Sequence, residues 1–227
     1  MIEEIETVWN TTTTPKTSAS FDVVAGDLLV VVGHKRDGAS FLNTPTNTGT
    51  AFTWTLQQSV EIGTTEHKLY IWTAPATVTQ SMTVSVTQSA ANDGWGFSKF
   101  TFRYSGGVGA SVKTSSLGSG APSIDITTTR PGSAVIVFNS DNAAVDGASR
   151  TWRANAGTLT ETTYFRVAAQ EGLYIGYHAD AGVIGTYAVG LTAPTGQSYH
   201  MIALEILALH TKRPEGGMVS LSGGLSV

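Results

Sequence analysis

The sequence contains no cysteine in its 227 residues. This absence excludes disulfide bonds and thiolate metal ligands. We therefore expect the folded chain to be held together by packing or by assembly with other chains.

Positive charge and long apolar runs are also scarce. Lysine and arginine total 13 against 17 acidic residues, a net charge of −4, which gives no electrostatic reason to bind nucleic acid. The apolar run Leu28–Val32 ends at Gly33, far short of the roughly 20 residues that span a bilayer. The acidic start, Met1 to Glu6, is the reverse of a secretion signal. We expect a soluble protein that is not secreted by the classical route, with no membrane insertion and no nucleic-acid partner.

Strong catalytic signatures are missing as well. The sequence has no phosphate-binding glycine loop, no Gly-x-Ser-x-Gly elbow and no His-Glu-x-x-His zinc helix. A glycoside hydrolase needs paired carboxylates, but few acids lie inside the expected strands, the main ones being Asp22, Asp125 and Glu205. We predict no enzyme activity, no catalytic residues, no metal site and no cofactor.

Two weaker clusters leave a metal or acid–base role open. His178 and Asp180 are two positions apart, so a strand would place both on one side. Asp141 and Asp146 could offer oxygen ligands to Ca²⁺, although the EF-hand spacing is missing. The preferred interpretations are a solvated strand end and a polar hairpin loop.

The chain is rich in threonine and has 25 glycines, a composition typical of strands joined by many turns. It also carries a weak internal duplication. Leu69–Ile71 returns as Leu173–Ile175, an offset of 173 − 69 = 104, and flanking blocks recur in the same order at similar offsets. The duplication predicts two halves that contain similar β-strands in the same order.

Alternation of apolar and polar residues predicts the strands. In 97–104 it places Lys99 and Arg103 on one face and aromatic rings on the other, so we expect one face in the core and one in water. The expected strands are 20–24, 28–34, 52–60, 67–73, 82–87 and 97–104, then 124–128, 134–140, 151–154, 164–169 with 173–178, 186–191 and 199–207.

The predicted fold class is all-β, a jelly-roll-like β-sandwich of about 12 strands. Because each half alone would leave exposed sheet edges, we favour one sandwich built from two similar halves over two separate domains. The expected organisation is an N-terminal segment 1–17, a sandwich 18–208 with halves 18–105 and 123–208 joined by a Gly/Ser-rich linker 106–122, and a C-terminal arm 209–227.

Positions that break the repeat are the candidate binding residues. Trp72 has Gly176 as its counterpart, since 72 + 104 = 176, and Trp95 follows the turn that contains Asn92 and Asp93. Planar aromatic rings can stack on sugars, so these four residues are weak candidates for glycan binding. Trp54 and Trp152, by contrast, occupy equivalent places and are predicted to be structural.

The apolar residues of the C-terminal arm are the candidates for assembly. They are Met218, Val219 and Leu221, which follow a flexible Pro-Glu-Gly-Gly joint. Such a segment could add a strand to a neighbour's sheet edge.

The strand and turn pattern resembles that of a known group of proteins. The blocks Phe21–Val32, Phe52–Leu56, Leu69–Trp72, Thr83–Val86, Phe102–Gly106 and Met201–Leu207 look like the β-sandwich modules in virion proteins of tailed actinobacterial phages, commonly labelled minor tail proteins. The resemblance spans roughly 18–208, and its motifs are of low specificity. It carries over no functional residue.

The resemblance implies a non-enzymatic virion structural role, with other tail or capsid subunits as partners, a homo-oligomer within the particle, and contact with host-surface glycans at loops. A capsid decoration protein and a carbohydrate-binding surface module are the alternatives. The resemblance puts the minor tail protein first, made in the host cytoplasm and located in the virion, and the sequence leaves a tail or a capsid position open.

Overall fold

The computed structural model describes residues 2–11, 14–36, 40–61, 67–90, 94–168 and 170–209, and side chains from residue 14 onward except that of Ser119. These residues form 18 strands and no helix, which confirms the all-β prediction. No helix that could cross a membrane occurs in this part of the chain. The strand count exceeds the predicted twelve because several short strands and two long ones were not expected.

The chain forms two similar halves. Each half contains one five-stranded antiparallel sheet, and the two orders match strand for strand: β1-β10-β4-β7-β6 in the first half and β11-β18-β13-β16-β15 in the second. These two large sheets consist of β1 (Ile2–Thr11), β10 (Trp95–Phe102), β4 (Leu28–Lys35), β7 (Lys68–Pro75) and β6 (Thr55–Glu61), and of β11 (Ser105–Gly120), β18 (Gln197–Ala208), β13 (Ala134–Asp141), β16 (Glu171–His178) and β15 (Leu159–Val167).

Small sheets cover the outer face of each large sheet. In the first half they are β2-β9-β5 and β3-β8, and in the second half β12-β17-β14. Their strands are β2 (Lys16–Thr17), β3 (Phe21–Val23), β5 (Thr46–Asn47), β8 (Gln80–Met82), β9 (Val84–Val86), β12 (Ser123–Thr127), β14 (Thr151–Trp152) and β17 (Thr186–Ala193). Each half is thus a β-sandwich in its own right.

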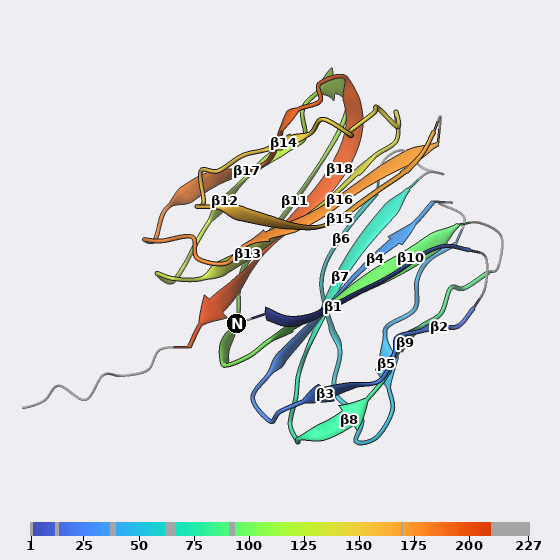
Figure 1. The fold of residues 1–227 in the computed structure, drawn as a ribbon, viewed down its shortest axis with the longest axis vertical. Helices are drawn as coiled ribbons and strands as arrows, with labels where there is room; N and C mark the ends of the chain where they lie inside the picture. The colour runs from blue at the N-terminus through green and yellow to red at the C-terminus, as the bar shows by residue number, and fades with distance from the viewer. Residues whose placement is uncertain are drawn as a thin grey trace, which may run out of the picture.

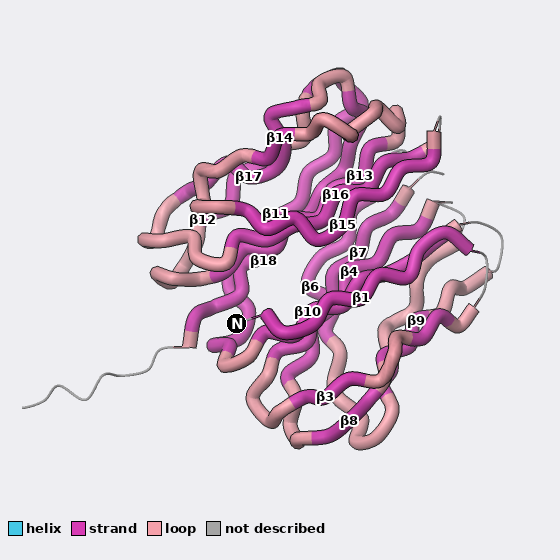
Figure 2. The backbone as a smooth tube through the Cα atoms, viewed as in Figure 1, coloured by secondary structure: helices cyan, strands magenta, loops and turns pink. Residues whose placement is uncertain are grey.

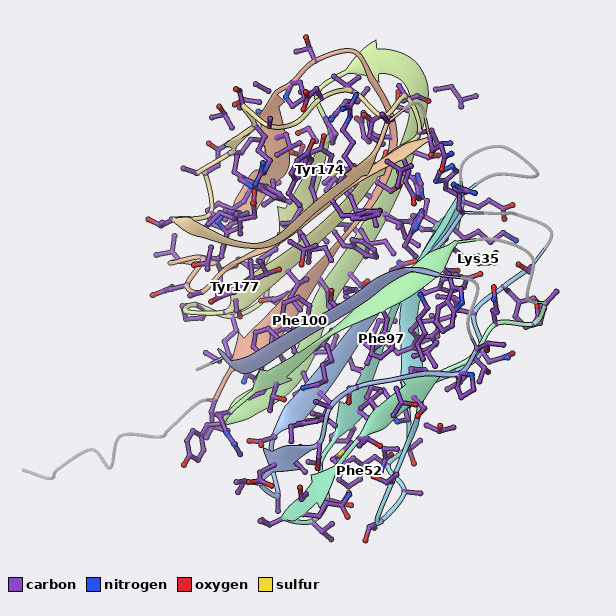
Figure 3. The ribbon with its side chains drawn as sticks, turned by 45° about the vertical axis from the view of Figure 1, so that its right-hand side comes forward. Lys35, Phe52, Phe97, Phe100, Tyr174 and Tyr177 are labelled. Atoms are coloured by element: carbon purple, nitrogen blue, oxygen red, sulfur yellow. The ribbon has the colours of Figure 1, made fainter. Side chains whose placement is uncertain are left out.

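The two sandwiches pack back to back through their large sheets, with the first half, blue to green, below the second half in Figure 1, and Figure 2 shows the same layers as a tube. The layer between the large sheets, here called the central core, is apolar and comes from both halves. It contains Leu28, Val30, Val32, Leu69, Ile71, Phe100, Phe102, Ile136, Phe138, Leu173, Ile175, Ile202, Leu204 and Ile206. Phe100 lies between the halves in Figure 3, whereas Phe52 lies in the outer layer of the first half.

This arrangement differs from the single shared sandwich that we predicted. Because each half supplies its own cover sheet, it also has its own outer core, one around Trp72 and Phe97 and one around Val137 and Val189. The central strands of both large sheets, β4, β7, β10, β13, β16 and most of β18, are therefore buried on both faces. Lys99, expected in water, lies buried with its ammonium 3.6 Å from the centre of the Phe21 ring.

The expected linker 106–122 is largely β11, a 16-residue strand that pairs with β18. Its glycines and serines are typical of linkers, so the strand was not expected. At Gly109 the glycine is required by close packing, because a Cβ there would lie 2.1 Å from Oε2 of Glu205. The expected N-terminal segment contains β1, which pairs with β10 as β11 pairs with β18. The repeat therefore begins one strand earlier than the sequence suggested.

Candidate metal centre

Three histidines and one glutamate close one end of the central core. Alternate positions of each large-sheet strand face this core, and the apolar row on each strand ends in a polar residue. His34 follows Val32 on β4, and His67 precedes Leu69 at the start of β7. The second half contributes Glu171, two positions before Leu173, and His200, two positions before Ile202. These four residues are called the His/Glu cluster below.

Three atoms of the cluster form a small triangle. Nε2 of His34 lies 3.2 Å from Nδ1 of His67 and 3.3 Å from Oε2 of Glu171. Nδ1 of His67 lies 3.7 Å from the same carboxylate oxygen. Two ligand types that bind transition metals, imidazole and carboxylate, thus converge across the boundary between the halves.

His200 completes the cluster from β18. Its ring centre lies 6.4 Å from that of His34 and 6.1 Å from that of His67. Its side chain is fully buried, and among the described residues neither ring nitrogen has a hydrogen-bond partner. Buried polar atoms are nearly always paired, so two unpaired nitrogens beside other donor atoms point to a missing partner.

Burial favours the neutral form of His34 and of His200. It lowers the pKa of His34 well below its usual value, and the charges of His67, His200, Lys35 and Arg36 lower it further. Burial, with a smaller contribution from His67, lowers the pKa of His200 to about 3. A neutral imidazole keeps the lone pair that a metal ion requires.

The surroundings of the cluster are strongly polar on the side of the first half. Arg36, directly after β4, donates a hydrogen bond to the side chain of Gln170, next to Glu171. Figure 3 shows Lys35 at this same end of β4.

A cleft of about 490 Å³ lies on the boundary between the halves. It is lined by Ser59, Val60, Glu61, Lys68, Tyr70, Lys113 and Ser115.

Sequence reasoning missed this cluster, and it predicted no metal site. The four residues are spread from position 34 to position 200 and follow no ligand-spacing motif. One signal was present: His67 and Glu171 are equivalent in the repeat, since 67 + 104 = 171. His67 directly precedes β7, and Glu171 is the first residue of β16. Only the packing of one half on the other brings them together.

Trp72 and Trp95, the weak candidates for glycan binding, are core residues. Trp72 is 2% exposed and stacks on Tyr70, with ring centres 5.1 Å apart. Trp95 is 1% exposed, and the ammonium of Lys16 lies 4.8 Å from its ring centre. The ring of Trp72 packs over Gly33, where an added Cβ would lie 3.1 Å from the ring.

The two weaker clusters of the sequence are structural. Nδ1 of His178 is hydrogen-bonded to the carbonyl of Gly157 at 3.0 Å, and Asp180 accepts a hydrogen bond from the amide of Gly182. Asp141 is buried and accepts backbone hydrogen bonds from Ala143 and Val145. Both of its oxygens are therefore engaged in a turn.

The remaining predicted site residues lie outside the described residues. These are the glycan candidates Asn92 and Asp93 and the assembly candidates Met218, Val219 and Leu221.

Comparison with known proteins gives no relative. No protein-family model, no curated protein and no solved structure matches this chain. The fold and the cluster therefore rest on the sequence and structure of this chain alone.

Proposed function

We propose that this chain is a non-enzymatic structural subunit of a tailed-phage virion, mounted on the tail and surrounded by other virion proteins. The observation that carries the proposal is the four-layer packing of two sandwiches, in which the central strands of both large sheets are buried on both faces. Such a block is suited to bearing load and to presenting outer surfaces to neighbours. The His/Glu cluster supports a structural role because it is buried between the halves, where a substrate cannot reach it.

The C-terminal arm, residues 209–227, would attach the subunit to neighbouring virion proteins. The N-terminal segment is already used within the chain, since β1 pairs with β10. Strands β1 and β15 each end a large sheet, and a sheet edge of this kind accepts an added strand. The arm of one copy would bind such an edge on the next subunit.

Purified particles of the phage that encodes the chain test the role. Mass spectrometry is expected to find the chain at a fixed copy number, and immunogold labelling to place it on the tail. Absence from washed particles would overturn the virion role, and labelling of the head would replace the tail position by capsid decoration.

A chain that lacks residues 214–227 tests the attachment. We expect it to melt at the same temperature as the full chain and to be missing from particles. Unchanged incorporation would show that the arm does not attach the subunit.

Glycan binding by tryptophan is not part of the proposal. Trp72 and Trp95 are buried in the outer core of the first half, so neither ring offers a face to a sugar.

A further inference from the structure

We propose that the His/Glu cluster binds one Zn²⁺ ion between the two halves, with His34, His67 and Glu171 as ligands and His200 as the fourth. This site is independent of the virion role, since it rests on the interior of a single chain. It would join β4 and β7 of the first half to β16 and β18 of the second.

The triangle of donor atoms has the size of one face of a zinc tetrahedron. Zinc binds nitrogen and oxygen ligands at about 2.0–2.1 Å, so neighbouring ligand atoms lie about 3.3 Å apart. The three observed separations are 3.2, 3.3 and 3.7 Å. An ion could therefore contact all three atoms with small adjustments.

Hydrogen bonds among the three atoms explain this triangle less well than a bound metal ion does. Nε2 of His34 faces both Nδ1 of His67 and Oε2 of Glu171 at hydrogen-bond distance. A neutral imidazole nitrogen carries at most one proton, so it can donate to only one of them. A metal ion at the centre would satisfy all three atoms at once.

His200 stands near the remaining ligand position. The rings of two imidazoles on one tetrahedral zinc ion have centres about 5.2 Å apart, and those of His34 and His67 are 5.3 Å apart. The ring of His200 is farther away, at 6.1 and 6.4 Å. A shift of about 1 Å would bring it into the tetrahedron. Its two unpaired nitrogens leave it with no competing hydrogen bond among the described residues.

The donor set selects the class of metal. Imidazole nitrogens favour zinc and related transition metals, whereas Mg²⁺ and Ca²⁺ prefer all-oxygen sites. The positive charges of Lys35 and Arg36 lower the pKa of His34 and would also repel a bound cation. The negative charge of the Glu171 carboxylate offsets part of this repulsion. We therefore expect a single transition-metal ion, and no retention of Mg²⁺.

The test uses the full chain, purified without a histidine tag. It is stripped with EDTA, refilled with Zn²⁺ or with Mg²⁺, desalted, and analysed for metal by mass spectrometry and for melting temperature. We expect about one zinc ion per chain, a melting temperature raised by zinc and lowered again by EDTA, and no bound magnesium. Zinc well below one ion per chain, with no shift in melting temperature, would overturn the site.

Three single variants locate the ion. Glu171→Gln and His67→Gln are expected to lose the bound zinc and the zinc-dependent rise in melting temperature. His178→Gln is the matched control, because His178 is a buried histidine outside the cluster, and it is expected to keep both. Zinc retained by Glu171→Gln and His67→Gln at the level of the control would place the ion elsewhere and refute the proposal.

A spectrum of the wild-type chain keeps the proposal testable if these variants do not fold. Co²⁺ in place of zinc is expected to give the intense visible absorption of a tetrahedral nitrogen and oxygen site. The weak absorption of octahedral cobalt would contradict the proposed ligand set.

Discussion

Lys16 shows how a charged side chain is accommodated inside the first half. It is 4% exposed, and its ammonium donates a hydrogen bond to the carbonyl of Trp95 and lies against the ring of the same residue. Burial lowers the pKa of Lys16 to about 8. The folded chain therefore binds its proton less tightly than the unfolded chain does.

The free energy of unfolding should consequently rise with pH. Between the folded pKa of about 8 and the unfolded value of 10.5, the unfolded state binds more protons, so stability increases in this window. From pH 7.5 to pH 9.5 we expect a gain of roughly 1 to 2 kcal/mol in urea unfolding. Lys16→Met should abolish most of this gain. An equal gain in the variant would show that Lys16 is not its source.

Gly109, on β11, leaves space for the carboxylate of Glu205, which is hydrogen-bonded to this strand. Glu205 on β18 accepts hydrogen bonds from the backbone amides of Ala110, Thr129 and Arg130. Burial by itself raises the pKa of Glu205, but these amides and nearby hydroxyls bring it below its usual value. The ionised side chain thus joins β11 to the turn that follows β12.

Substitution of two β11 glycines tests this packing. Gly109→Ala would place its Cβ against Glu205 and Leu207, whereas a Cβ at Gly118 would meet only Ser116 Oγ, at 3.5 Å. We expect Gly109→Ala to cost about 1–3 kcal/mol in urea unfolding and Gly118→Ala to cost much less. Equal effects of the two substitutions would show that β11 does not depend on this close contact.

Alternation and repetition predict most of the large-sheet strands of this chain. They fail at β11, because glycine and serine are typical of linkers, and the contact that requires Gly109 comes from β18, far along the chain. They also fail at Lys99, because alternation cannot show that a second layer covers the other face of β10.

The site was less predictable than the fold. The His/Glu cluster forms only when the two halves pack together, and no local pattern contains that information. The repeat does relate His67 to Glu171, but it cannot place one opposite the other.

The central core makes the two sandwiches one cooperative unit. Phe100 is fully buried there, against side chains of both halves. We expect Phe100→Ala to cost about 3–5 kcal/mol and to lower hydrogen-exchange protection in β13 and β16 as well as in β4. Leu117, 74% exposed, supplies the control, since Leu117→Ala should change stability by less than about 0.5 kcal/mol. Loss of protection confined to the first half would mean that the halves unfold independently.

The two halves meet across a buried face, and we propose that the polar end of this face holds a metal ion. The most direct measurement is X-ray diffraction from crystals of the zinc-loaded chain, collected on both sides of the zinc absorption edge. We expect one anomalous peak about 2.0–2.2 Å from Nε2 of His34, Nδ1 of His67 and a carboxylate oxygen of Glu171. Anomalous peaks at surface residues only, with these three side chains hydrogen-bonded to one another, would contradict the proposed metal site.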